Sequence, residues 1–251
     1  MTEKIFTDAP PRRKPFVILC YPRTGSYLLV DLLSQFPEIA CHGEIFKGNH
    51  VELPPAIKDK VGYDVEKRNQ DPFGYIRKIV ATEGDKHTGF KIFPSHCKEA
   101  YNWCVASAEI NRVALWRSPF EVYVSLKRAT TRGKWTDRSG QSKNDSKKLV
   151  FDSDVFDRNI RLFSNQNRNL RKLAEADPMS TILINYKQVT DPEAVREVAK
   201  FLGVTVQPEK LEYRLHKQTT ERYSELFENF EELMNHVKAN HPKIQIDPEK
   251  I

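Results

Sequence analysis

Residues 16–36 constrain the fold of this chain more than any other stretch. They begin with six apolar residues, Phe16 to Tyr21, which suit a strand buried on both faces of a parallel sheet. After a short polar turn, apolar residues recur at helical spacing from Tyr27 to Phe36. A buried strand, a tight loop and an amphipathic helix in this order predict an α/β fold with a central parallel sheet flanked by helices.

The loop between this strand and this helix, Pro22-Arg23-Thr24-Gly25-Ser26, has the composition of an anion-binding site. Gly25 permits a positive φ, Thr24 and Ser26 offer hydroxyl groups, and the helix offers unpaired N–H groups. Arg23 adds a planar, permanently charged group that matches phosphate or sulfate oxygens. An ordinary turn with a serine N-cap is the alternative. No Walker sequence Gly-x-x-x-x-Gly-Lys-Ser/Thr occurs, which disfavours a metal-dependent nucleoside triphosphatase.

A second strand, turn and helix are predicted over residues 112–129. Residues 112–116 are typical of a strand, and Pro119 suits the first position of the helix that follows. Arg117 therefore lies at the end of a strand, and Ser125 lies eight residues later in the helix. A helical serine alone is more often solvated than a ligand. The arginine at the strand end favours a second anion site.

These two sites together resemble the sulfotransferases that use 3′-phosphoadenosine 5′-phosphosulfate (PAPS). In that family a loop of the Pro-Arg/Lys-Ser/Thr-Gly-Ser/Thr type holds the 5′-phosphosulfate, as residues 22–26 would here. A later arginine, followed by a serine eight residues on, holds the 3′-phosphate, as Arg117 and Ser125 would. The segment from Ile184 to Gly203 is similar to the family's Tyr-Glu-x-Leu…Pro…Phe-Leu-Gly segment, and by this resemblance Tyr186 is expected to bind the cofactor.

The resemblance covers residues 16–235 and is strongest to two branches of the family. Residues 124–135 resemble trehalose-type bacterial sulfotransferases, and Cys41-His42-Gly43-Glu44 resembles tyrosylprotein sulfotransferases. Tyr27, also expected at the cofactor, departs from the family pattern because many members carry a second Thr or Ser there. Lys217 precedes the last predicted helix, where the family often has a basic loop over the 3′-phosphate. A solvated basic turn is the alternative for Lys217.

Sulfuryl transfer requires positive charge where the bond to the leaving phosphate breaks. We expect Arg23 to supply it, with help from Lys91, whose charge inside a predicted strand implies a ligand nearby. A hydroxyl acceptor also needs a general base, for which Glu44 is the first candidate. His42 is the competing candidate, because positions 42 and 44 share a side if the segment stays extended. The sequence has no obvious metal site, which fits in-line transfer without a metal.

The 251 residues, 39% of them hydrophobic, are sufficient for one sizeable α/β core. We expect a flexible N-terminal arm over residues 1–15 and a single sulfotransferase domain of P-loop-NTPase-like fold over 16–251. Residues 47–87 are rich in Pro, Lys and Asp without clear periodicity and are expected to form an insertion on the acceptor side. Residues 132–150 are expected to form a mobile basic loop.

Composition also limits the location and the partners of the chain. The four cysteines show no Cys-x-x-Cys or secreted-framework spacing, which favours reduced thiols in a cytoplasm. No run of 18 apolar residues and no signal-peptide core occur, so no membrane span is expected. The formal net charge of +6 suits a polyanionic ligand, but no interleaved aromatic pattern indicates specific nucleic-acid binding.

The sequence therefore predicts a cytoplasmic enzyme that moves a sulfuryl group from PAPS to a hydroxyl of a carbohydrate or other small acceptor. Two alternatives remain open at this point. One is an ATP-dependent small-molecule kinase of P-loop-like fold, which would need a Walker loop and Mg²⁺ ligands. The other is a non-enzymatic module that binds nucleotides or polyanions.

Overall fold

The computed structural model describes residues 4–6, 13–133, 135, 147–215 and 221–251, and they form two compact units that we describe one at a time. The first unit comprises Met1–Trp116 and Leu170–Glu212, and the second comprises Arg117–Asn169 and Tyr213–Ile251. Lys217 and most of the predicted basic loop lie outside the described residues. Within the described part of the chain, no helix is long and apolar enough to cross a membrane.

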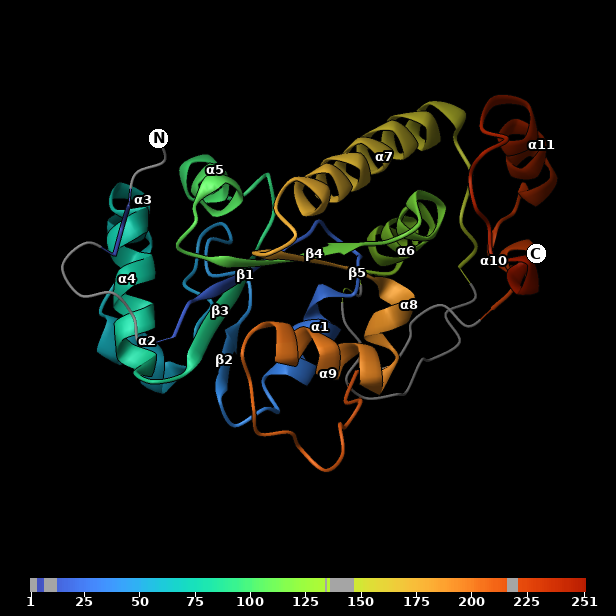
Figure 1. Ribbon diagram of the computed structural model, residues 1–251. Helices are drawn as coiled ribbons and strands as arrows, with labels where there is room; N and C mark the ends of the chain where they lie inside the picture. The colour runs from blue at the N-terminus through green and yellow to red at the C-terminus, as the bar shows by residue number, and fades with distance from the viewer. Residues whose placement is uncertain (1–3, 7–12, 134, 136–146, 216–220) are drawn as a thin grey trace. The chain divides into compact units, whose positions relative to one another are not determined.

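The first unit is built on a five-stranded sheet in which every pair of neighbouring strands is parallel (Figure 1). The strands lie in the order β2-β3-β1-β4-β5. Their bounds are β1 Phe16–Leu19, β2 Ile39–His42, β3 His87–Ile92, β4 Asn111–Trp116 and β5 Thr181–Asn185. The parallel α/β fold predicted from the sequence is confirmed. The carboxyl ends of parallel strands meet at one edge of a sheet, which is where such folds bind ligands.

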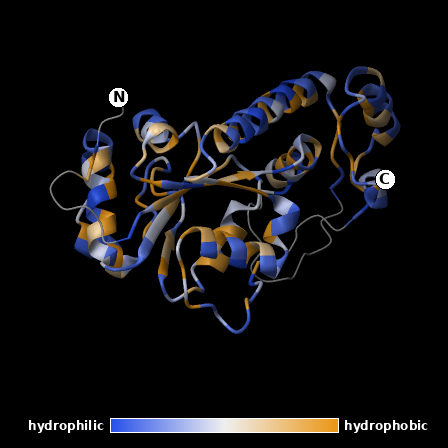
Figure 2. Ribbon diagram, in the orientation of Figure 1, coloured by the Kyte–Doolittle hydropathy of each residue, from blue (hydrophilic) through white to orange (hydrophobic). Residues whose placement is uncertain are grey.

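Helices cover both faces of this sheet, with α5 on one face and α1 and α9 on the other (Figure 1). Figure 2 shows the apolar residues concentrated in the strands and in the helix sides that meet them. The helices of this unit are α1 Ser26–Leu33, α2 Pro55–Val61, α3 Val65–Gln70, α4 Pro72–Glu83, α5 Lys98–Ala106, α8 Tyr186–Val189 and α9 Pro192–Phe201.

Strand β1 and helix α1 form as their residue pattern requires. All four residues of β1 are buried, since this strand lies in the middle of the sheet with helices on both faces. Helix α1 buries Leu28, Leu29, Leu32 and Leu33, which recur at helical spacing along one side. Its N-cap is Gly25, which has φ +89° and makes no side-chain cap. The first N–H groups of α1 therefore face the loop without a capping side chain.

The segment 47–87 contains the three helices α2, α3 and α4, although the sequence showed no clear periodicity there. Two aspartates are the N-caps of α3 and α4. The carboxylate of Asp64 accepts from the Lys67 N–H at 2.8 Å, and that of Asp71 accepts from the Gly74 N–H at 2.8 Å. Helices α2 and α3 are too short to show a period, whereas α4 buries Tyr75, Ile76, Ile79 and Val80 at helical spacing, a pattern that the sequence analysis missed.

The described residues of the predicted N-terminal arm contact the first unit. The backbone N–H groups of Ile5 and Phe6 donate to the carboxylate of Glu109, at 2.8 and 3.2 Å. The side chain of Ile5 is buried, and the ring of Phe6 lies 6.4 Å from that of Trp103. These contacts hold residues 5 and 6 beside the C-terminal end of α5.

The second unit is helical and has an aromatic core. Its helices are α6 Pro119–Arg132, α7 Ser153–Ala176 up to residue 169, α10 Tyr223–Leu226 and α11 Phe230–Asn240, followed by the 3₁₀ turn η1 Pro248–Lys250. Pro119 is the first residue of α6, as predicted. Tyr123, Phe156 and Phe227 belong to the buried core, which brings α6, α7 and the C-terminal segment together. Leu149 and Phe227 pair as an isolated parallel bridge.

Candidate active site

The loop that follows β1 is held in a tight, partly left-handed conformation. Arg23 has φ +69° and Gly25 has φ +89°, and a positive φ is uncommon for a residue with a side chain. The buried hydroxyl of Thr24 donates to the carbonyl of Tyr21 at 2.8 Å, which closes the loop on itself. Thr24 thus anchors the loop, while Ser26 begins the helix whose N–H groups face it. Such a loop at a helix N-terminus is suited to bind an anion.

Tyr186 packs directly on this loop from the start of α8. A Cβ atom added to Gly25 would lie 2.4 Å from Cδ2 of the Tyr186 ring, closer than any real contact of that kind. Gly25 is therefore required for its positive φ and for the close approach of this ring. The structure brings together Gly25 and Tyr186, two residues that sequence analysis assigned to the cofactor and that lie 161 positions apart.

Lys91 is the centre of the polar cluster at the carboxyl end of β3. Its side chain is 0% exposed, and its ammonium Nζ lies 2.9 Å from Oε1 of Glu44. The same Nζ donates to Oγ of Ser26 at 3.4 Å. It also lies 2.9 Å from the centre of the Tyr27 ring, a cation–π contact. Ser26 and Tyr27 from one motif and Glu44 from another thus meet around the buried positive charge of Lys91.

The charges of Glu44 and Lys91 depend on each other. Burial opposes the ionisation of Glu44, but Lys91, with smaller contributions from Lys47 and His96, holds the pKa of Glu44 below its ordinary value. Burial lowers the pKa of Lys91, and the negative charge of Glu44 counteracts this. The imidazole of His96 lies 3.7 Å from Glu44, and burial lowers the pKa of His96. Glu44 is therefore an ionised carboxylate at neutral pH, in contact with a cation and near a neutral imidazole.

The ring of Tyr27 contacts the ammonium group of Lys91. This contact is a structural reason for a tyrosine where many sulfotransferases carry Thr or Ser. The Tyr27 hydroxyl donates to Oε1 of Glu52 at 3.0 Å. Burial and the carboxylates of Glu44 and Glu52 raise the pKa of Tyr27, so the phenol keeps its proton. Glu52 also packs on Gly43, where an added Cβ would lie 2.3 Å from Oε1. Sequence analysis did not identify Glu52, because its partners Tyr27 and Gly43 lie 25 and 9 residues away along the chain.

His42 and Glu44 contact different groups. Nε2 of the buried His42 lies 3.1 Å from Oε1 of Glu83 in α4, whereas Glu44 contacts Lys91. The contact with His42 lowers the pKa of Glu83. The chain leaves the extended conformation at Gly43, which is a bend, so positions 42 and 44 do not continue as one strand. The structure brings Glu44 to the loop of α1 through Lys91 and pairs His42 with α4.

Arg68 holds the backbone that follows Glu44. This side chain is almost fully buried, and its guanidinium donates to the carbonyl oxygens of Gly48 at 2.7 Å and His50 at 2.9 Å. Further bonds reach the carbonyls of Ile45 and Lys47. Sequence analysis did not single out Arg68, because a charged residue in a polar segment is normally solvated.

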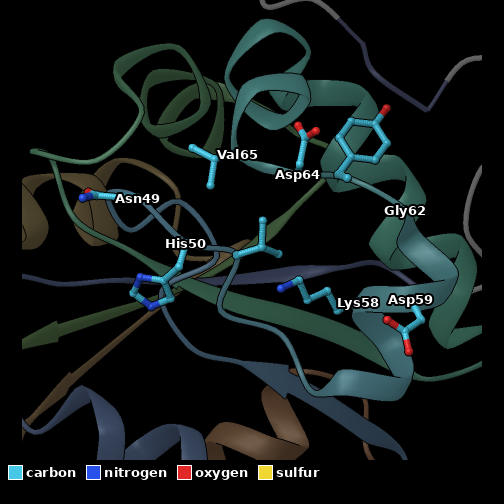
Figure 3. Close-up of a pocket in the computed structure, with 9 residues that line it drawn as sticks. Asn49, His50, Lys58, Asp59, Gly62, Asp64 and Val65 are labelled. Carbon is cyan, nitrogen blue, oxygen red and sulfur yellow. The ribbon is translucent and has the colours of Figure 1, made fainter.

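The segment 47–87 also encloses an open pocket of about 530 Å³. Figure 3 shows Lys58 extending toward the loop that carries His50. Glu52, two residues after His50, accepts the hydrogen bond from the Tyr27 hydroxyl. The lining is mixed polar and apolar: Asn49, His50, Val51, Lys58, Asp59, Gly62, Tyr63, Asp64 and Val65.

Arg117 and Ser125, the predicted 3′-phosphate residues, belong to the second unit. Nε of Arg117 lies 3.1 Å from Oε2 of Glu121, one turn later in α6, and the Arg117 carbonyl accepts from Nδ2 of Asn167 at 2.8 Å. Ser125 is buried in α6. Arg128, one turn beyond Ser125, pairs with Glu221. Among the predicted cofactor residues, Lys217 lies outside the described part of the chain.

The parallel sheet, the loop before α1 and the carboxyl-edge cluster define the fold class of the sulfotransferases, as expected from the sequence. The sulfotransferase domain from the curacin biosynthetic pathway superposes with a TM-score of 0.54 at 15% identity, covering 94% of this chain and 93% of that chain. A sulfotransferase from Alicyclobacillus acidocaldarius gives a TM-score of 0.48 at 16% identity, covering 94% of this chain and 97% of the other.

The sequence comparison points to one curated relative. The chain is 25% identical to Nodulation protein H of Rhizobium tropici over 235 residues, which is 90% of each protein. No protein-family model matches the chain. The similarity extends over the length of both proteins.

Proposed function

We propose that this protein is a sulfotransferase that moves a sulfuryl group from PAPS to a hydroxyl of a carbohydrate or other small acceptor. The observation that carries the proposal is the buried Lys91 ammonium, which contacts both Ser26 of the anion loop and the Glu44 carboxylate. Lys91 thereby connects Ser26, which we assign to the leaving phosphate, with Glu44, which we assign to the acceptor hydroxyl. The sulfotransferase fold and the similarity to Nodulation protein H support this assignment.

On this proposal the loop binds the phosphosulfate end of PAPS. Arg23, the N–H groups at the start of α1 and the hydroxyl of Ser26 stabilise negative charge on the bridging oxygen as its bond to sulfur breaks. Tyr186, packed on Gly25, lines the same loop. The transfer is in line and independent of a metal ion, because these groups supply the positive potential that it needs.

Glu44 is the general base in this mechanism. As an ionised carboxylate it accepts the proton of the acceptor hydroxyl while the oxygen attacks sulfur. Proton uptake neutralises Glu44, and the charge of Lys91 then has no fixed counterion beside it. That positive charge becomes available next to Ser26 at the moment when negative charge grows on the leaving phosphate. Lys91 would thus couple proton removal to bond breaking.

The remaining predicted residues keep their roles as proposals. Arg117, Ser125 and Lys217 are assigned to the 3′-phosphate from the sequence resemblance alone. The segment 47–87 is assigned to the acceptor, and the polar groups of its pocket suit hydroxyl-rich molecules. We also propose a cytoplasmic location, supported by four cysteines that form no disulfide.

Nucleotide binding distinguishes this proposal from a kinase and from a polyanion-binding module. Calorimetry should show metal-independent binding of adenosine 3′,5′-bisphosphate that is tighter than that of ATP, with or without Mg²⁺. Arg117→Ala should weaken it about tenfold to a hundredfold, because a charged hydrogen bond is lost. Arg161→Ala, an exposed position on α7, is the control. Mg²⁺-dependent preference for ATP would instead indicate a kinase, and salt-sensitive binding to nucleic acid without this preference would indicate a polyanion module.

The base assignment is tested with Glu44→Gln, which keeps the shape of the side chain. Turnover of PAPS with an accepted hydroxyl substrate should fall about a hundredfold or more, with little change in bisphosphate affinity. Glu83→Gln, a buried carboxylate in contact with His42, is the matched control and should retain most activity. If Glu44→Gln is active and His42→Asn is not, His42 is the base.

A further inference from the structure

Three metal-ligating side chains converge in the second unit, far along the chain from the residues of the proposed transfer site. Asp157 lies in the first turns of α7, His236 in α11 and His241 directly after α11. Nε2 of His236 lies 2.8 Å and Nε2 of His241 lies 2.7 Å from the same oxygen, Oδ1 of Asp157. All three ligand atoms lie within 4.8 Å of one another.

This donor set matches the preference of a transition-metal cation. Two imidazoles and one carboxylate are a common set for Zn²⁺, which binds such atoms at about 2.0–2.2 Å. Ligand atoms on a tetrahedral zinc ion lie about 3.4 Å apart. The two imidazole–carboxylate separations must therefore open, and the two imidazole nitrogens already lie within 4.8 Å of each other. The three side chains are half-buried, so a fourth position remains accessible to water.

The surroundings of the imidazoles fit a metal site as well. Rings of Phe151 and Phe156 lie 5.4 and 5.9 Å from the ring of His236, and Phe156 lies 5.5 Å from His241, which restricts both imidazoles. Nδ1 of His236 lies 3.2 Å from Nδ2 of Asn240. If the side-chain amide of Asn240 is turned over, its Nδ2 no longer donates to the His236 carbonyl, and its Oδ1 can accept from a protonated Nδ1 of His236. Metal-bound histidines commonly have such a partner.

We propose that Asp157, His236 and His241 bind one Zn²⁺ ion that ties α11 and the residues after it to α7. The two helices already share a buried core that includes Phe156, Leu233 and Val237. A metal bond beside this core would hold the last described segment of the chain in place. The role is structural, so it stands independently of the proposed sulfuryl transfer.

The test is zinc binding to the full chain after treatment with a chelator. Equilibrium dialysis with elemental analysis should find one Zn²⁺ per chain, and Asp157→Asn and His241→Gln should each lose it. His50→Ala removes an exposed histidine of the first unit and should retain it. Zinc should also raise the melting temperature of the wild-type protein, with no such rise in the two variants.

A second measurement uses only the wild-type protein, in case a variant fails to fold. X-ray absorption of the zinc-loaded chain should show nitrogen and oxygen neighbours with two imidazoles and no sulfur. Absence of zinc binding, equal binding by the folded variants, or sulfur ligation would each overturn the proposal.

Discussion

The buried ammonium of Lys91 gives the sharpest test of how this site is held together. Lys91→Met keeps the apolar stem of the side chain and removes its charge. Glu44, only 6% exposed, then remains as a buried carboxylate without its partner at 2.9 Å. Breaking a buried ion pair from one side costs about 3–5 kcal/mol of folding free energy. The cation–π contact with Tyr27 contributes about 2 kcal/mol when desolvated, which places the expected loss in the upper part of that range.

Lys47→Met is the matched control, because the same carboxylate has a second lysine nearby. Nζ of Lys47 lies 3.7 Å from Oε2 of Glu44, but its side chain is 47% exposed. An exposed pair of this kind contributes about 0.2–1 kcal/mol. The two substitutions remove the same charge and differ mainly in burial.

The assay is urea unfolding of a double-mutant cycle formed by Lys91→Met, Glu44→Gln and the double variant, followed by fluorescence and circular dichroism. The double variant should recover stability relative to Lys91→Met, with a coupling of about 1.5 kcal/mol or more. In Lys91→Met, burial without the ammonium raises the pKa of Glu44, so the loss should shrink as the pH falls toward the ordinary carboxyl value of about 4.3, because protonation removes the unpaired charge. A loss no larger than that of Lys47→Met, or strictly additive effects, would refute the reasoning.

Three further predictions follow from the geometry. Gly25→Ala should weaken adenosine 3′,5′-bisphosphate binding measured by calorimetry, because its Cβ overlaps the Tyr186 ring, whereas Gly133→Ala, with φ +67° and open space around it, should not. Burial lowers the pKa of His96 in the folded protein below its unfolded pKa of about 6.5. The stability that comes from the neutral imidazole is therefore complete above a pH of about 6.5, and the free energy of unfolding decreases as the pH falls below that value. His96→Asn should reduce this decrease, measured by urea unfolding at a series of pH values. Burial raises the pKa of the Cys20 thiol to about 12, so mass spectrometry after thiol alkylation at pH 8 should find Cys97 modified and Cys20 intact; labelling of Cys20 in the folded protein would contradict its burial after β1.

Part of the fold could be predicted because it depends on local patterns. Six apolar residues before Pro22 indicated β1, and leucines at helical spacing indicated α1. Gly25 between them indicated the positive φ that the loop adopts. The same reasoning failed over residues 47–87, because α2 and α3 are too short to show a period and the helical spacing of Tyr75, Ile76, Ile79 and Val80 in α4 was not recognised.

The sequence by itself determined the parallel α/β class, and it predicted the loop from Pro22 to Ser26 and the candidates Glu44 and Lys91, since each depends on residue types within a few positions. The tertiary structure decided which of these groups touch. It placed Lys91 on the ring of Tyr27, brought Glu52 to the Tyr27 hydroxyl and paired His42 with Glu83. Such contacts join strands and loops that lie far apart in sequence, so their partners are selected by packing and not by spacing along the chain.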